Sequence, residues 1–176
     1  MLTGNHNLLI TNPRDLPSMI KDLSRYPFSG FVGLNTLFAA LCNNADFRKL
    51  DFSSLKMTVS GGMALQIATA KRWTEVTGCP ICEGYGMTET SPIATVNPIQ
   101  NIQLGTIGIP APSTLCKIID DEGRELPLGE VGELCVKGPQ VMKGYWQRED
   151  ATRDTLDAGG WLRTGDIGII QEDGYI

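Results

Sequence analysis

The sequence has little of three features that indicate a function early, namely histidine, clustered basic residues and long apolar runs. It holds 15 lysines and arginines against 20 aspartates and glutamates, a net charge of −5, and its basic residues form no run. Binding a nucleic-acid backbone requires concentrated positive charge. We therefore expect no nucleic-acid partner.

No stretch approaches the roughly 20 apolar residues that a membrane-spanning helix needs. The N-terminus also lacks the basic, apolar and small-residue order of a secretory signal peptide. These absences predict a cytoplasmic protein.

The five cysteines form an odd set in a chain of 176 residues, which favours free thiols over a disulfide framework. Cys79 and Cys82 have the CxxC spacing of redox and zinc sites, but a four-ligand site would have to recruit Cys42, Cys116 or Cys135. We favour a structural interpretation, in which Cys79 lies in a turn and Cys82 in a buried strand. The alternative, a redox or zinc protein, requires bound metal or a thiol of low pKa.

Up to about residue 100, short apolar runs alternate with segments of helical period. Apolar runs at residues 8–10, 31–34, 55–59 and 80–85 predict strands, and apolar positions at helical spacing predict helices between them. Such alternation is typical of a mainly parallel sheet covered by helices.

After residue 100, turn signals recur every eight to twelve residues between short strands such as 115–119 and 132–136. This spacing predicts an antiparallel, barrel-like β unit. We therefore expect an α/β fold with two parts: residues 1–100 as part of a mainly parallel, helix-covered sheet, and residues 101–176 as part of a small antiparallel β-barrel-like domain. Because the last strand stops at Ile176 before it could pair and the first sheet is thin, we expect a piece of a longer protein.

The segment EGYGMTETSP at residues 83–92 concentrates chemical groups at the end of a predicted strand, where ligands of open α/β sheets bind. Gly84 and Gly86 allow the backbone to approach a ligand, and Tyr85 offers a face for stacking on a base. Thr88 supplies a hydroxyl suited to phosphate, and Glu89 a hard oxygen ligand suited to Mg²⁺. The set is consistent with an adenine nucleotide and its metal.

A structural interpretation of this segment is also open: Thr88 and Thr90 would cap a helical turn that Pro92 ends. Two further segments argue for a ligand. The glycine-rich turn SGGMAL at residues 60–65 follows the preceding strand, and WLRTGD at residues 161–166 ends in Asp166, a carboxylate suited to ribose hydroxyls.

Together these segments resemble the adenylate-forming enzymes, which include acyl-CoA synthetases, luciferases and peptide-synthetase adenylation domains. The stretches GNHNLLITNPRD, GFVGLNTLF, LDFSSLK, EGYGMTE, GELCVKGPQVMKGYW and GWLRTGDIG are most similar to bacterial long-chain fatty acid–CoA ligases. The resemblance covers essentially the whole chain.

The resemblance implies a role for each matching residue. Tyr85 would stack on adenine opposite a wall formed by Gly61, Gly62 and Met63, where Met63-Ala64 replaces the family's frequent Ala-Pro. Gly84 and Gly86 would flank the reacting carboxylate. The resemblance also assigns Thr88 to the α-phosphate, Glu89 to Mg²⁺, Asp166 to the ribose, and an acyl tunnel to Val32, Gly33, Leu34, Asn35 and Thr36.

The implied reaction has two steps, with ATP and coenzyme A as substrates and Mg²⁺ as cofactor. A fatty carboxylate attacks the α-phosphate of ATP to give acyl-adenylate and pyrophosphate, and the CoA thiol then displaces AMP. The family's phosphate loop and its C-terminal domain, with the lysine that reaches the α-phosphate, have no match in this sequence. We therefore expect the isolated chain to be inactive.

Other interpretations remain open. The parent enzyme could adenylate a different acid, although the sequence offers no acidic anchor for an amino-acid substrate and the apolar GFVGLNTLFAAL favours a lipid chain. A non-catalytic nucleotide-binding module is the alternative outside the enzymes. Because long fatty acids partition into bilayers, the parent could associate peripherally with the inner face of the cell membrane. An exposed sheet edge would favour homo-oligomers.

Overall fold

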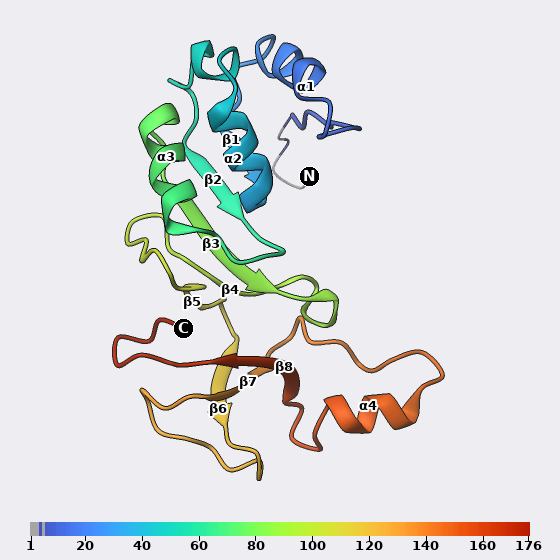
Figure 1. Ribbon diagram of the computed structural model, residues 1–176. Coiled ribbons are helices and arrows are strands. Elements are labelled where there is room, and N and C mark those ends of the chain that lie inside the picture. The colour runs from blue at the N-terminus through green and yellow to red at the C-terminus, as the bar shows by residue number, and fades with distance from the viewer. Residues whose placement is uncertain (1–3, 5) are drawn as a thin grey trace.

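The computed structural model describes residues 4 and 6–176. They form two sheets, and the chain passes from the first sheet to the second between β5 and β6 (Figure 1). The first sheet has five strands in the order β1-β2-β3-β4-β5. Their bounds are Gly30–Gly33 (β1), Met57–Ser60 (β2), Ile81–Gly86 (β3), Ile93–Val96 (β4) and Ile109–Pro110 (β5). The pairs β1·β2 and β2·β3 are parallel, whereas β4 and β5 extend the sheet antiparallel to their neighbours.

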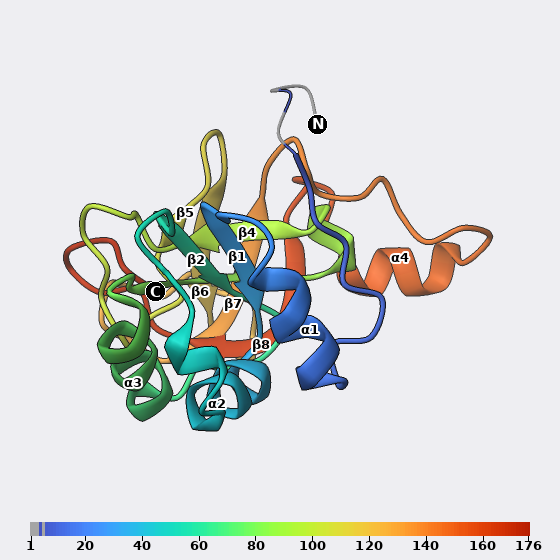
Figure 2. The same cartoon turned by 90° about the horizontal axis from the view of Figure 1, so that it is seen from above.

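Three helices pack on the same side of the parallel strands (Figure 2). They are α1 (Leu16–Leu23), α2 (Asn35–Asn43) and α3 (Ile67–Thr77). Two of the helix ends have a local cause: the Asp15 carboxylate accepts the Ser18 N–H at the start of α1, and Gly78 closes α3 with a φ of 72°. The predicted helix-covered parallel sheet is confirmed for this part of the chain.

The core under these helices is built around Trp73 of α3, which is fully buried. Its ring lies 4.8 Å from that of Phe38 and within 5.5 Å of those of Phe31 and Phe47, measured between centroids. The indole N–H donates to the Thr58 hydroxyl on β2 at 3.1 Å, so that the buried donor is satisfied.

The second sheet contains three antiparallel strands in the order β6-β7-β8, with bounds Leu115–Ile119, Gly132–Lys137 and Leu162–Gly168. It confirms the antiparallel β unit predicted after residue 100, as an open sheet rather than a closed barrel. A short helix, α4 (Glu149–Thr155), lies between β7 and β8. Two 3₁₀ turns, Phe47–Lys49 and Thr88–Thr90, complete the regular structure of the described residues.

Several sequence-based expectations differ from the structure. Residues 8–10 form no strand, and Leu9 is 80% exposed, because an apolar run becomes a strand only where a neighbouring strand offers its edge. Helix α4 was not predicted, and since it buries no residue it has no apolar period by which to find it.

The end of the chain also differs from expectation. Ile176 pairs with the segment before β5, since its N–H donates to the Gly108 carbonyl at 2.9 Å and its carbonyl accepts the Ile107 N–H at 2.8 Å. The two strands β4 and β5 were likewise not predicted, and β5 belongs to the first sheet although it follows residue 100. Among the described residues, no helix has the length and apolar character needed to cross a membrane.

Candidate functional site

The glycine-rich turn after β2 lies against the end of β3. Ser60 is paired with Glu83 in the parallel register, and a Cβ at Gly61 would lie 3.8 Å from the carbonyl oxygen of Gly84. The two segments that the sequence indicated as walls of a ligand site are therefore neighbours, at the carboxyl ends of adjacent parallel strands.

Two buried side chains hold this turn in place. The Glu83 carboxylate accepts the Leu65 N–H at 2.8 Å, and the Asn35 side-chain oxygen accepts the Gln66 N–H at 3.0 Å. Glu83 is only 8% exposed, and burial raises the pKa of its carboxyl group. The end of the turn is thus fixed by β3, which carries the tyrosine motif, and by α2, while Gly62 and Met63, just before these contacts, are exposed.

Tyr85 and Asp166 meet although 81 positions separate them in sequence. The Tyr85 hydroxyl donates a 2.6 Å hydrogen bond to Oδ2 of Asp166. Burial, together with the hydrogen bond that the hydroxyl donates to the Asp166 carboxylate, raises the pKa of Tyr85 to about 12. The tyrosine is therefore a neutral hydrogen-bond donor at physiological pH.

A β-bulge aims Asp166 at this position. In the β7·β8 pairing, Glu133 faces Ile167 and Cys135 faces Arg163, so residues 164–166 stand opposite one residue of β7. Gly165 takes a φ of 74° there, and its N–H donates to Oε1 of Glu133 at 3.0 Å. Arg163, next to this bulge, forms an ion pair with Oε2 of the same glutamate at 2.6 Å. Glu133 thus holds the Thr-Gly-Asp turn, a role that the sequence did not indicate.

The Met-Thr-Glu turn confirms the structural role expected of Thr90, whereas the binding roles of Thr88 and Glu89 remain predictions. Thr90 is buried and structural: its hydroxyl accepts the Met87 N–H at 2.9 Å and donates to the Pro92 carbonyl at 2.7 Å. Thr88 is exposed on the same 3₁₀ turn. Oε1 of Glu89 accepts a 2.7 Å hydrogen bond from the Tyr145 hydroxyl. No sequence pattern indicated Tyr145 as a partner of Glu89.

The two glycines around Tyr85 differ in how much space a side chain would have. A Cβ at Gly86 would overlap the Pro92 carbonyl, so glycine is required there by the turn itself. A Cβ at Gly84 would lie 3.2 Å from the Thr95 carbonyl oxygen, which is a tight but lesser contact.

The five residues predicted to line a tunnel do not share one environment. Val32 is 74% exposed and Leu34 is 40% exposed, whereas Asn35 is buried and holds the glycine-rich turn. Gly33 packs against the ring of Phe38, and Thr36 is exposed. The tunnel assignment remains a prediction.

The cysteine pair takes the positions that the structural interpretation predicted. Cys79 follows the helix-ending Gly78, Cys82 lies in β3, and both are buried free thiols. Burial raises the pKa of the Cys82 thiol, which disfavours the reactive thiolate.

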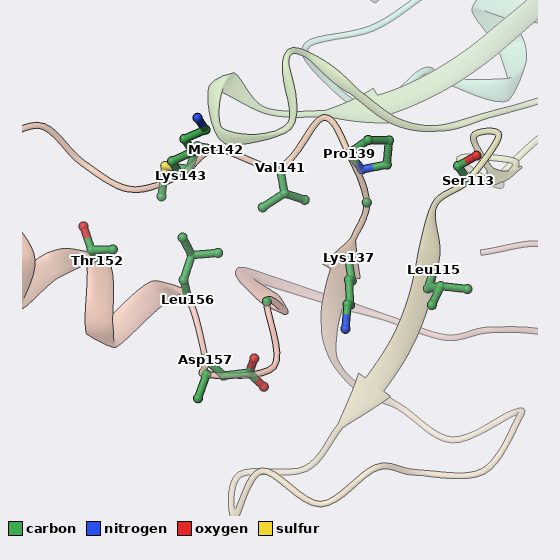
Figure 3. Close-up of a pocket in the computed structure, with 13 residues that line it drawn as sticks. Ser113, Leu115, Lys137, Pro139, Val141, Met142, Lys143, Thr152, Leu156 and Asp157 are labelled. Carbon is green, nitrogen blue, oxygen red and sulfur yellow. The ribbon is translucent and has the colours of Figure 1, made fainter.

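A separate cavity of about 670 Å³ opens between the segment after β7, the start of β6 and the end of α4 (Figure 3). Its lining includes Lys137, Val141, Thr152, Leu156 and Asp157. None of the residues assigned from the sequence to the nucleotide or the acid lines this cavity, so it is distinct from the candidate site.

The glycine-rich turn and the tyrosine motif lie at the carboxyl ends of neighbouring parallel strands, and the aspartate-bearing bulge of the second sheet contacts the tyrosine there. In open α/β sheets this edge is where ligands bind. The model of the AMP-binding enzyme family matches residues 1–146. The chain therefore belongs to that family.

Close relatives carry a specific name. The chain is 53% identical over 174 residues to the long-chain-fatty-acid–CoA ligase of Escherichia coli O6:H1, and 55% identical over 174 residues to that of Yersinia pestis. Each match covers 98% of this chain and 31% of the relative. The chain thus spans about a third of the length of these relatives.

Solved structures agree with the fold. The anthranilate CoA ligase AuaEII, in complex with anthranoyl-AMP, matches with a TM-score of 0.87 and 33% identity. The match covers 96% of this chain and 32% of that one. The α/β architecture described above is therefore that of the adenylate-forming enzymes.

Proposed function

We propose that this chain is part of a long-chain fatty acid–CoA ligase. Such an enzyme joins a fatty carboxylate to the α-phosphorus of ATP with loss of pyrophosphate. In a second step the thiol of coenzyme A attacks the acyl carbonyl, and AMP leaves. The observation that carries the proposal is the 2.6 Å contact between Tyr85 and Asp166, which brings the proposed adenine and ribose residues together.

The residues would divide the nucleotide between them. Tyr85 would offer its ring to adenine, and the turn that carries Gly61, Gly62 and Met63 would form the opposite wall. Asp166 would accept hydrogen bonds from the ribose hydroxyls through the carboxylate lone pairs that the Tyr85 hydroxyl does not use. The exposed Thr88 hydroxyl would donate to the α-phosphate, with Gly84 and Gly86 beside the reacting carboxylate.

The residues present fit a magnesium ion that arrives with ATP. No group of three or more His, Cys, Asp or Glu side chains among the described residues is arranged as a metal site. Mg²⁺ is, however, usually bound through one or two carboxylates together with substrate phosphates and water. Glu89 supplies one such carboxylate, and the bound ion would offset phosphate charge.

The choice of a long-chain acid rests on the relatives. Identity to the long-chain-fatty-acid–CoA ligases reaches 53–55%, against 33% to the anthranilate CoA ligase. The exposed apolar Val32 and Leu34 are suitable contacts for an acyl chain. Adenylation of an aryl acid is the second candidate, because a ligase for such an acid shares the fold at a TM-score of 0.87.

Carboxylate-dependent exchange between ATP and pyrophosphate tests the proposal. We would run it on the full-length protein with fatty, aryl and amino acids, beside the 176-residue chain. Exchange by the full-length protein with long-chain acids, and none by the chain alone, is the expected result. Exchange only with aryl acids would favour the second candidate, and no exchange with any acid would contradict the ligase assignment.

A further inference from the structure

The segment after β7 is attached to Glu89 through both its backbone and its side chain. The Met142 N–H donates to the Glu89 carbonyl at 2.8 Å, and the Tyr145 hydroxyl donates to Oε1 of Glu89 at 2.7 Å. The second sheet thus reaches back to the turn that carries the proposed metal ligand. The backbone contact fixes the turn, and the side-chain contact orients the carboxylate itself.

This segment, residues 138–147, is itself anchored at both ends. Gln140 donates through Nε2 to the Thr114 hydroxyl at 2.8 Å and to the Ile93 carbonyl at 3.2 Å. At the other end, the Tyr145 N–H donates to the Thr152 hydroxyl of α4 at 2.9 Å. Tyr145 is therefore presented to Glu89 from a fixed backbone.

Glu89 depends on this tyrosine for its side-chain contacts. Within the described part of the chain its carboxylate forms no ion pair, and Tyr145 supplies its one side-chain hydrogen bond. That bond uses Oε1 and leaves Oε2 without a hydrogen bond to these residues. A glutamate without such a bond would lose rotamer freedom when it bound a cation.

We propose that Tyr145 is a positioning residue, which holds the Glu89 carboxylate ready for the divalent cation that accompanies ATP. The proposal rests on the proposed function, because it concerns the cation of that reaction. Residues that hydrogen-bond a ligating carboxylate orient it, and their removal typically weakens metal binding by about 10- to 100-fold. A carboxylate held in place before binding also loses less freedom on binding.

The test measures Mn²⁺ binding to the full-length protein in the presence of ATP, without an acid substrate, by electron paramagnetic resonance. Tyr145→Phe removes only the hydroxyl and is expected to raise the dissociation constant for Mn²⁺ about tenfold. Tyr26→Phe is the matched control, because Tyr26 is 46% exposed in the first part of the chain. Glu89→Gln removes the carboxylate and serves as the reference for loss of the proposed metal ligand.

An unchanged Mn²⁺ dissociation constant in Tyr145→Phe would overturn the proposal, as would no Mn²⁺ binding by the wild type with ATP. In the exchange reaction, we expect a higher KM for Mg²⁺ and an unchanged kcat at saturating Mg²⁺, a split that general loosening of the fold would not produce. If the wild type shows no exchange with any acid, the proposed function fails, while the Mn²⁺ measurement still decides the role of Tyr145.

A spectroscopic measurement tests the contact without metal. The hydrogen bond to Glu89 raises the pKa of the Tyr145 hydroxyl. Ultraviolet titration, with Tyr145→Phe subtracted to isolate this tyrosine, should show ionisation at lower pH in Glu89→Gln than in the wild type. Identical titrations would contradict the contact itself.

Discussion

The Tyr85 hydroxyl and the Asp166 carboxylate form a 2.6 Å hydrogen bond between the two sheets. One oxygen of Asp166 is therefore already engaged by the residue proposed to stack on adenine. The contact sets the ring and the carboxylate in a fixed relation, as a site for the base and the sugar of one nucleotide requires. Tyr85 therefore has two groups with different proposed functions: its hydroxyl binds Asp166, and the face of its ring would stack on adenine.

The first prediction concerns these two functions. Tyr85→Ala removes the ring, and since stacking on a base contributes about 1–3 kcal/mol, ATP binding should weaken by about fivefold to 150-fold. Tyr85→Phe keeps the ring face and should change the ATP dissociation constant by no more than about threefold. Isothermal titration calorimetry on the full-length protein measures both. Equal losses in the two variants would rule out stacking as the main contribution of Tyr85.

Gly86→Ala should destabilise the protein by about 3 kcal/mol, because the new Cβ would overlap the Pro92 carbonyl and the backbone would have to move. Gly84→Ala is the matched comparison. Its Cβ would lie 3.2 Å from the Thr95 carbonyl oxygen, so a cost of about 1 kcal/mol is expected. Urea unfolding gives both free energies, and a Gly86→Ala variant as stable as Gly84→Ala would show that the turn can relax.

Two hydroxyls on β2 should respond in opposite directions when removed. Thr58→Val takes the acceptor away from the buried Trp73 indole N–H, which should cost about 1–3 kcal/mol. Ser60 is fully buried, and its hydroxyl has no hydrogen-bond partner among the described residues. Ser60→Ala should therefore leave the free energy of unfolding unchanged or raise it by up to about 1 kcal/mol. A clear loss of stability in Ser60→Ala would reveal a partner for this hydroxyl.

Glu83 predicts a pH dependence of stability with a defined sign. Burial raises the pKa of its carboxyl group in the folded protein above the ordinary value of 4.5, so folding favours the protonated form. The stability contributed by this group is therefore fully present below pH 4.5 and is lost as pH rises through the raised folded pKa.

The matched variant is Glu83→Gln, which keeps an oxygen acceptor for the Leu65 N–H but does not titrate. The free energy of unfolding of the wild type, minus that of Glu83→Gln, should fall as pH rises from 4.5 toward neutrality. Urea unfolding of both proteins across this range measures the difference. A difference that stays constant with pH would contradict a raised pKa for Glu83.

Local patterns predicted the elements whose partners lie nearby in sequence. The apolar runs at residues 31–34, 55–59 and 80–85, with the helical periods between them, predicted β1, α2, β2, α3 and β3, since each of these elements has buried side chains. Residues 8–10 had a similar run and formed no strand, because a strand also requires a neighbouring edge. Helix α4 has no buried face, so its sequence shows no apolar positions at helical spacing.

By itself, the sequence determined the family, the alternation of strands and helices, and the chemical groups at residues 60–63, 83–89 and 166. Tertiary structure decided which of these groups meet. The β7–β8 bulge that Glu133 holds brings Asp166 to Tyr85, and the anchored segment after β7 brings Tyr145 to Glu89. Such contacts join residues 56 and 81 positions apart. Local propensity carries no signal for them, because they depend on how two different sheets pack against each other.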